Sequence, residues 1–186
     1  MNQFQKWMRR RVQLPVKILA LLLAGGLFVF LIPYTLVVLA PRLDAWLGLP
    51  DFYIGWINIL VCVLLVICGG YFAFSSIFQQ LFKADGTPLP FIPTQKLLAN
   101  NVFQLTRNPM TLGTICIYTG VAILAGSISA LLVVILFFSL LLIYIKKIEE
   151  RELEIRFGKA YLHYKNNTPF LFPRFKSGKS NQRKKM

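Results

Sequence analysis

The sequence predicts an all-α, polytopic membrane protein with about four transmembrane helices, the last two of which form a hairpin. Hydrophobic residues make up 56% of the 186 residues, and the mean hydropathy is +0.59. This apolar share exceeds that of ordinary soluble domains. The apolar residues are gathered at 14–40, 54–82, 111–126 and 128–145, with polar connections between these runs. A chain of this length fits one compact domain.

The formal net charge of +14 has two explanations. A strongly basic chain can bind nucleic acid, or its basic residues can mark the loops and tails that stay on the cytoplasmic side of a membrane. Most of the lysines and arginines lie in the tails before the first apolar run and after the last one, rather than within one folded region. The position of the charges therefore indicates membrane topology, with membrane lipids and no nucleic acid as partners.

The cysteines and the histidine predict no metal site. Cys62, Cys68 and Cys116 all lie within apolar runs, where cysteine usually behaves as a small buried hydrophobe. His163 is the one histidine, so the chain has no ligand set for structural zinc and no even disulfide framework. We therefore expect no bound metal.

The first apolar run, 14–40, follows a basic segment that contains Lys6, Arg9, Arg10 and Arg11. A secretory signal peptide shows the same order of charge, but its apolar core is shorter and ends at a cleavage site. This run is long enough to cross a bilayer with some tilt, so it predicts a retained membrane helix. A kink is expected at Pro33, and a short loop at 41–53.

The second run, 54–82, is interrupted by Gly69-Gly70 and becomes more polar towards its end, at Ser75, Ser76, Gln79 and Gln80. Two explanations remain open: these turns emerge into the headgroups or line a cavity, or the helix simply ends there. The connection that follows, 83–108, contains Pro88, Pro90 and Pro93, a density of proline that excludes a regular helix. A short helix is predicted at 94–104, with Thr94 as its N-cap.

The last two apolar runs, 111–126 and 128–145, are joined by Gly126-Ser127. So short a connection predicts an antiparallel helical hairpin, whose far ends return to the same membrane face. Segment 106–113, which reads Thr-Arg-Asn-Pro-Met-Thr-Leu-Gly, then becomes a neighbour of Glu149, Glu150 and Glu152. Two distant pieces of sequence therefore form one predicted site.

Short cytoplasmic helices are predicted after the hairpin. The fourth membrane helix continues through Lys146 and Lys147 to about Phe157, Gly158 ends it, and a short amphipathic helix follows at 159–164. Segment 169–172, Pro-Phe-Leu-Phe, is expected to return to the membrane interface, and the basic segment 177–186 to be a disordered tail.

Lysine and arginine predict the orientation. The amino tail, the 83–108 connection and the carboxyl-terminal part after the fourth apolar run, 146–186, carry nearly all of them, whereas the other two loops carry only Arg42. Because basic segments are retained in the cytoplasm, both termini are expected on the cytoplasmic side of the membrane. Residues 1–82 then hold the basic tail and the first two helices, 83–173 a core with the predicted site, and 174–186 a basic tail.

Each half of the predicted site also has a simpler explanation. Arg107-Asn108-Pro109 can be an ordinary helix start, with Asn as N-cap, Pro in the first turn and Arg reaching towards lipid phosphates. Glu149, Glu150, Glu152 and Glu154 can be a solvated helix face. These four, however, are more than half of the seven acidic residues in the chain, and they are gathered next to a membrane that favours basic residues.

The residues of the core resemble a known family. The matching pieces are Arg107 to Gly113 (Arg-Asn-Pro-Met-x-Leu-Gly), Glu149 to Leu153, Phe157 to Tyr164, and Pro169 to Pro173, with Gly86 to Pro90 upstream. In this order and spacing they resemble the integral-membrane methyltransferases, which comprise the isoprenylcysteine carboxyl methyltransferase family and its bacterial phospholipid-methyltransferase-like relatives. The resemblance covers 83–173, which identifies that segment as a methyltransferase-like core.

The resemblance implies an enzyme that uses S-adenosylmethionine as methyl donor, without a metal. Arg107, Asn108 and Pro109 would form one wall of the donor site, and Glu149 and Glu150 the other. Arg107 and Glu150 would be the catalytic residues. The acceptor would be lipophilic or membrane-embedded, a carboxylate or a lipid amine. A glutamate can take the proton of an amine acceptor, whereas a carboxylate acceptor needs no base and can be oriented by Arg107.

Departures from the family pattern leave an alternative. Phe103 and Thr111 stand where the relatives commonly carry tyrosine, and Asn101 stands where they carry glycine. Asn101 can adopt the backbone conformation of glycine. The two missing phenols leave room for an altered substrate or for lost activity, and thus for the alternative of a catalytically inactive homologue that serves as a scaffold or assembly protein. A transporter is disfavoured, since segments 54–81 and 110–145 contain no Lys, Arg, Asp or Glu.

Overall fold

The first membrane segment is one continuous run of helix. The computed structural model describes residues 13–87, 89, 92 and 94–173; the predicted basic tails at 1–12 and 174–186 and three of the connection's prolines lie outside these residues. The segment consists of α2 (Leu14–Gly26), η1 (Leu27–Leu31), α3 (Ile32–Tyr34), η2 (Thr35–Leu39) and α4 (Ala40–Leu47).

Two prolines are accommodated in this segment without ending it. Pro33 lies in the first turn of α3 and Pro41 in the first turn of α4, each after a π-helical stretch. The wider π-turns change the hydrogen-bond pattern next to a residue that has no N–H to donate. The predicted loop from residue 41 is therefore wrong. The helix ends instead at Gly48, whose φ of +67° suits glycine.

The second segment, α5 (Trp56–Phe82), packs lengthwise against α7 (Pro109–Leu124). α5 runs through Gly69-Gly70 without the predicted interruption. An added Cβ on Gly69 would lie 2.4 Å from the carbonyl oxygen of Gly113, and one on Gly113 would lie 2.4 Å from that of Gly69. The glycines therefore serve the close approach of two helices, as small residues commonly do in membrane proteins.

The last two helices form the predicted hairpin. α7 turns at Gly126 into α8 (Ile128–Tyr144), which continues through η3 (Ile145–Glu149) and α9 (Glu150–Phe157). The predicted extension of the fourth helix to Phe157 and its end at Gly158 are confirmed. α10 (Lys159–Asn167) is longer than predicted and packs against α6 (Val102–Leu105).

By length and composition, three helical segments of the described chain can cross a membrane: Leu14–Leu47, Trp56–Phe82 and Ile128–Phe157. α7 is a shorter apolar helix of 16 residues. Large apolar side chains such as Leu23, Phe30 and Phe74 are more than 70% exposed, which is expected of a surface in contact with lipid rather than water. The protein is thus an all-α integral membrane protein.

The prediction of a helix at 94–104 is wrong. Only α6 is helical there, and it begins after Asn101, whose φ of +54° confirms the glycine-like conformation expected of it. Residues 94–100 are irregular. The amide of Gln95 bonds the carbonyl of Ala84 at 2.6 Å, so the connection is fixed by tertiary contacts rather than by a helical repeat.

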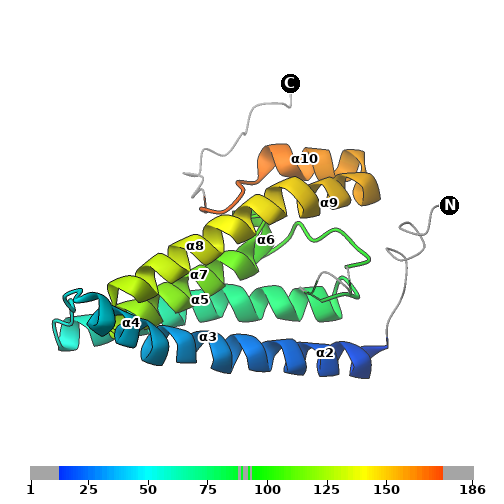
Figure 1. Ribbon diagram of the computed structural model, residues 1–186. Helices are drawn as coiled ribbons and strands as arrows, with labels where there is room; N and C mark the ends of the chain where they lie inside the picture. Colours follow the sequence, from blue (N-terminus) through cyan, green and yellow to red (C-terminus); the bar gives the residue numbers. More distant parts are fainter. Residues whose placement is uncertain (1–12, 88, 90–91, 93, 174–186) are drawn as a thin grey trace.

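The structure has a polar end and a hairpin-turn end. The start of α2, the end of α5, α9 and α10 lie towards one end, and α4, the start of α5 and the α7–α8 turn lie at the other (Figure 1). At the hairpin-turn end, Asp44 accepts a hydrogen bond from the Ser127 hydroxyl at 2.5 Å and one from the Ser129 amide at 3.0 Å. Asn58 donates to the carbonyl of Ile123 at 2.6 Å. These contacts tie the hairpin turn to the first two segments.

Candidate active site between the helical hairpin and the first membrane segment

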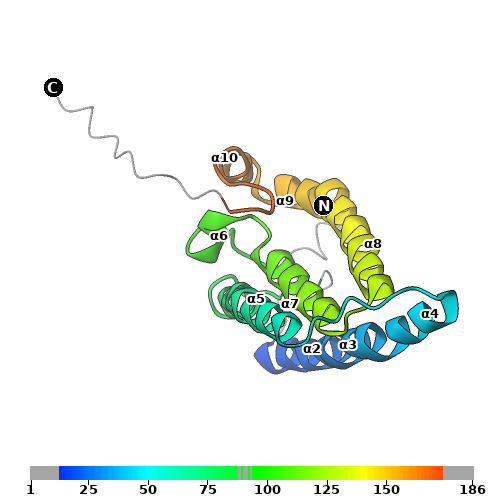
Figure 2. The same ribbon diagram turned by 90° about the vertical axis from the view of Figure 1, so that its left-hand side faces the viewer.

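A cavity of about 780 Å³ lies between the first membrane segment and the hairpin. Seen end on, α7 lies between α5 and α8, with α2 and α3 along one side (Figure 2). The cavity has a charged part and an apolar part. The charged part is lined by Arg107, Asn108, Glu149, Glu150, Glu152 and Arg156, and the apolar part by Phe28, Val29, Ile117, Phe137, Phe138 and Leu141. Its volume lies within the range of small-molecule binding sites.

The polar turns at the end of α5 contribute to this cavity. Ser76 and Gln80 line it, and the Gln80 amide donates to the Ser76 hydroxyl at 2.9 Å. Of the two explanations left open for these turns, the cavity lining is confirmed for Ser76 and Gln80. Gln79 lies instead in a second hollow, between α5 and α6.

Arg107 and Glu150 meet in the charged part of the cavity. Nη1 of Arg107 lies 2.5 Å from Oε1 of Glu150, and their side chains are 11% and 4% exposed. This contact is an ion pair without hydrogen-bond alignment, and the buried Nε of Arg107 has no hydrogen-bond partner among the described residues. The sequence prediction that the hairpin brings the arginine motif to the glutamates is confirmed.

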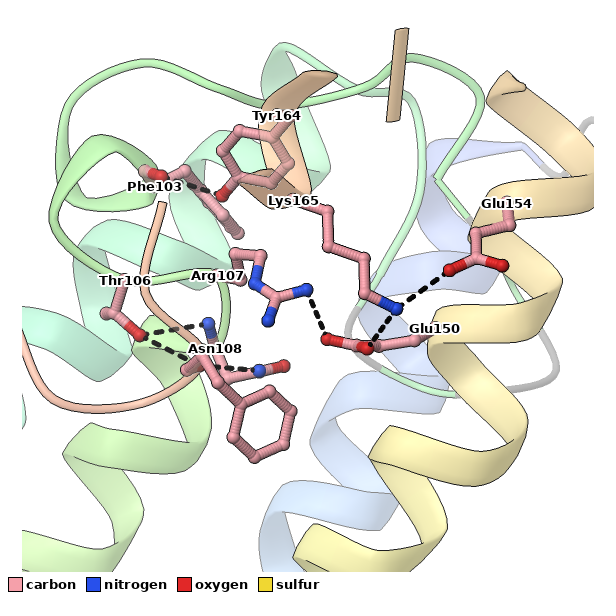
Figure 3. A network of polar contacts seen from close by, with 9 residues as sticks. Phe103, Thr106, Arg107, Asn108, Glu150, Glu154, Tyr164 and Lys165 are labelled. Carbon is pink, nitrogen blue, oxygen red and sulfur yellow. Dashed lines mark hydrogen bonds and ion pairs between the residues drawn. The ribbon is translucent and has the colours of Figure 1, made fainter. Parts of the chain in front are cut away.

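Lys165 from α10 neutralises the other oxygen of Glu150 (Figure 3). Its Nζ lies 2.8 Å from Oε2 of Glu150 and 2.7 Å from Oε1 of Glu154. Hydrogen bonds to these two carboxylates raise the pKa of Lys165 above its ordinary value, so the lysine is cationic at neutral pH. Both oxygens of Glu150 are therefore paired with cations.

The segment after α10 holds the arginine motif in place. Residues 169 and 170 lie against it: the carbonyl of Pro169 accepts from the Arg107 amide at 2.9 Å, and the carbonyl of Phe170 accepts from the Asn108 side chain at 2.8 Å. The Phe170 ring lies 5.5 Å from the Arg107 guanidinium carbon, a cation–π distance. Asn108 precedes α7 at the N-cap position, with Pro109 in the first turn, but its side chain makes no capping bond. It ties the motif to the carboxyl-terminal segment instead.

Glu149 and Glu150 differ although they are neighbours. Glu150 is 3% exposed and doubly paired. Glu149 is exposed and lines the cavity, and it has no ion pair or hydrogen bond to any side chain that the structure describes. Glu149 is therefore the carboxylate that is free to meet a ligand.

Arg156 is a cavity residue that the sequence motifs did not identify. Its Nη1 donates to the carbonyl of Thr94 at 2.9 Å, and its Nη2 donates to Glu152 at 3.0 Å. Nε is buried and has no partner among the described residues. Glu149, Glu152 and Arg156 share one face of the helix because they follow one another at spacings of three and four residues. That spacing is the signal that could have pointed to Arg156.

Residues 57–160 match the model of the phospholipid methyltransferase family, which is more than half of the chain. The chain belongs to this family. The matched range runs from α5 into α10 and includes Arg107, Asn108, Pro109, Glu149 and Glu150. Neither the curated proteins nor the solved structures show a significant match to the chain. The protein is thus an integral-membrane protein of a methyltransferase family, as the sequence resemblance indicated.

Phe103 and Thr111, the departures from the family pattern, both line the cavity. The carbonyl of Phe103 accepts a hydrogen bond from the Tyr164 hydroxyl at 2.6 Å, and burial raises the pKa of Tyr164 above its ordinary value. Burial also raises the pKa of Tyr161 to about 12. Both phenols are therefore protonated at neutral pH in the wall of the cavity.

Among the described residues, no group of three or more His, Cys, Asp or Glu side chains is arranged to hold a metal ion. Each carboxylate in the charged part is instead paired with a cation or directed at the cavity. This arrangement suits an organic ligand that carries charges of both signs.

Proposed function

We propose that the protein transfers a methyl group from S-adenosylmethionine to a lipophilic acceptor held in the cavity between the first membrane segment and the hairpin. The observation that carries this proposal is the composition of that cavity. Its charged part holds Arg107 and the glutamates, and its apolar part reaches Val29 and Phe74, which are 63% and 75% exposed on the outside of the helices. A lipid can therefore enter from the membrane while a polar donor binds at the other end.

The residues present fit the donor. S-adenosylmethionine carries an ammonium, a carboxylate, a ribose diol and a sulfonium. Arg107, Asn108 and Pro109 would form one wall of its site, and Glu149 and Glu150 the other. Glu149 is free to accept from the ammonium or the diol, and the unpaired Nε of Arg107 can donate to an anionic oxygen. We assign Glu150 to holding Arg107 in place, because both of its oxygens are already paired.

Methyl transfer requires alignment and a dry site more than it requires a reactive side chain. The bond between the sulfonium and its methyl carbon breaks as the acceptor atom bonds to that carbon, and the donor leaves as a neutral thioether. Alignment of the two reactants removes much of the entropic barrier, and a low-dielectric cavity favours a reaction that disperses charge. If the acceptor is an amine, Glu149 is placed to take its proton. If it is a carboxylate, Arg107 is placed to orient it.

We further propose that the charged part of the cavity faces the cytoplasm of a bacterial cell, with both termini on that side. This orientation is supported by the positions of the start of α2, the end of α5, and α10 towards the same end of the molecule (Figure 1). Segments 1–13, 83–108 and 146–186 hold 19 of the 21 lysines and arginines, and such basic segments stay in the cytoplasm.

The direct test is binding and transfer by the purified protein in detergent. Titration calorimetry should detect binding of S-adenosylmethionine to the wild type and weaker binding to Glu149→Ala. Incubation with the donor, labelled in its methyl group, and a membrane lipid extract should give a labelled lipid that is heavier by one CH₂ group than its parent. No binding by a monodisperse wild-type protein would contradict the proposal.

The alternative of an inactive scaffold rests on Phe103 and Thr111, since both remove a phenol from the cavity wall. Tyr118, Tyr144, Tyr161 and Tyr164 also line the cavity. The hydroxyls of Tyr118 and Tyr164 donate to backbone carbonyls, those of Phe28 and Phe103. This leaves Tyr144 and Tyr161 as phenols that can donate to a ligand, which supports the enzyme over the scaffold. A wild type that binds no donor and a double variant, Phe103→Tyr with Thr111→Tyr, that gains no transfer would favour the scaffold.

A further inference from the structure

The guanidinium of Arg156 is held on two sides and open on the third. Nη1 donates to the Thr94 carbonyl and Nη2 to Glu152, and the guanidinium carbon lies 5.4 Å from the Phe157 ring. These contacts fix the plane of the group. Nε is left without a partner among the described residues although it is shielded from solvent, and the side chain is 11% exposed in all.

An unpaired guanidinium N–H in such a place is costly unless a ligand satisfies it. A buried donor without an acceptor loses its hydration and gains nothing in return. Arg156 lines the same cavity as Arg107 and the glutamates. The open N–H therefore indicates a place for an oxygen that carries negative charge, either a carboxylate or a phosphate.

The charges around Arg156 restrict which anion fits. Glu152 forms an ion pair with Arg156, and Glu149 interacts with it electrostatically. Glu152 balances the charge of Arg156. Desolvation within the cavity and the neighbouring Glu152 raise the pKa of Glu149 to about 7, so Glu149 adds a partial negative charge and a simple anion would meet net repulsion. A ligand group that carries a cation beside its anion avoids this, because the cation meets Glu149 while the anion meets Nε of Arg156.

The other cations near the cavity are less suited to this role. Arg107 lies against Glu150, and Lys165 is shared by Glu150 and Glu154. The two cations and two carboxylates of this second group balance. The first group, Glu149, Glu152 and Arg156, is the one that lacks a positive charge, and it also holds the free carboxylate.

We propose that Glu149 and Arg156 form a binding site for a zwitterionic group, with Arg156 as the specificity residue for its anionic oxygen. This inference rests on the proposed function and adds Arg156 to it. Two ligands of a lipid methyltransferase carry such a group: the amino-acid end of S-adenosylmethionine, and a phosphoethanolamine headgroup of an acceptor lipid. In both, an ammonium and an anionic oxygen lie a few bonds apart.

The test measures how tightly the purified full-length protein binds two methyl donors, one with its carboxylate and one without it. Titration calorimetry with S-adenosylmethionine and with decarboxylated S-adenosylmethionine is done on the wild type, Arg156→Gln, Arg156→Lys and the control Arg151→Gln. Arg151 lies on the same helix and is exposed, so its substitution matches the change in charge. Methyl transfer to phosphatidylethanolamine in mixed micelles is measured with the same variants.

If Arg156 binds the donor's carboxylate, Arg156→Gln weakens binding of S-adenosylmethionine about tenfold to a hundredfold, as expected for a lost hydrogen bond to a charged group, and leaves that of the decarboxylated donor unchanged. If it binds the headgroup, both donors bind as before and the KM for phosphatidylethanolamine rises by a similar factor while kcat is retained. Arg156→Lys keeps the positive charge but loses the planar guanidinium, so binding should weaken less than in Arg156→Gln. It also serves as the test variant should Arg156→Gln not be monodisperse.

Two results would overturn the inference. In the first, the wild type binds S-adenosylmethionine but the Arg156 variants match Arg151→Gln with both donors and with the lipid; the proposed function then stands and the zwitterion site does not. In the second, the wild type binds no donor, which removes the proposed function and this inference with it.

Discussion

Nη1 of Arg107 and Oε1 of Glu150 lie 2.5 Å apart, and the two residues reach this contact from opposite arms of the helical hairpin. The pair is buried, and the second oxygen of Glu150 is taken by Lys165. Removal of one member of a buried pair leaves a charge without compensation, whereas removal of both leaves none. The pair therefore joins the two halves of the site, and its contribution to the free energy of unfolding can be measured.

Glu150→Gln is expected to lower the free energy of unfolding by about 3 kcal/mol, because it leaves the buried charge of Arg107 without its partner. Arg107→Gln should cost less, because Glu150 keeps its ion pair with Lys165. The double variant should lose less than the sum of the two, since it buries no unpaired charge from this pair. Denaturant unfolding in detergent, followed by tryptophan fluorescence, gives the three values. Additive losses would show that the two side chains do not interact.

Glu149→Ala is expected to weaken binding of S-adenosylmethionine with little change in Tm. Glu149 is exposed to the cavity and has no ion pair with a described residue, so its loss removes a ligand contact and no internal one. Glu154→Ala is the matched control, because Glu154 pairs with Lys165 and does not line the cavity. Equal donor affinity in the two variants would remove Glu149 from the binding site.

Patterns that depend on neighbouring residues were predictable from the sequence. The hairpin follows from two apolar runs joined by Gly126-Ser127, and the helix start at Pro109 follows from an asparagine and a proline in order. The approach of the motif to Glu150 then requires only that a hairpin returns its ends to one face. These predictions use local rules, and local rules are strongest for long apolar helices.

Contacts that depend on the assembled fold were not predictable. A proline normally marks the end of a helix, but π-turns allow the first segment to continue through Pro41. The side chain of Asn108 bonds the Phe170 carbonyl rather than capping α7, because segment 169–170 lies against it. Arg156 looks like a solvated residue of an amphipathic helix until the Thr94 carbonyl is placed beside it.

The glycines of the α5–α7 contact can be separated by substitution. Gly69→Ala is expected to destabilise the protein by about 1–3 kcal/mol, the usual cost of overpacking, since its Cβ would lie 2.4 Å from a backbone oxygen that cannot move aside. Gly70→Ala is the control, because its Cβ would meet only the Phe74 ring, at 3.9 Å. The measurement is the Tm of Gly69→Ala and of Gly70→Ala in the same detergent, which should be lower for Gly69→Ala. Equal Tm values would mean that the helices do not approach closely at Gly69.

Asp44→Asn tests whether the hairpin-turn end stabilises the fold independently of the active site. The two oxygens of Asp44 accept from the Ser127 hydroxyl and the Ser129 amide, and Ser127 in turn caps α8 by accepting from the Ala130 amide at 3.0 Å. An asparagine has one oxygen in place of two, so one of these donors loses its acceptor.

A buried donor without an acceptor costs about 1–3 kcal/mol, so Asp44→Asn should lower the Tm clearly. Asp51→Asn should not, because Asp51 is exposed in the loop before α5. α4, which carries Asp44, lies at the opposite end of the molecule from α9, which carries Glu150 (Figure 1), and the helices between them are rigid elements. Binding of S-adenosylmethionine below the Tm should therefore be unchanged in both variants. A large loss of donor affinity in Asp44→Asn would show instead that the hairpin turn sets the geometry of the cavity.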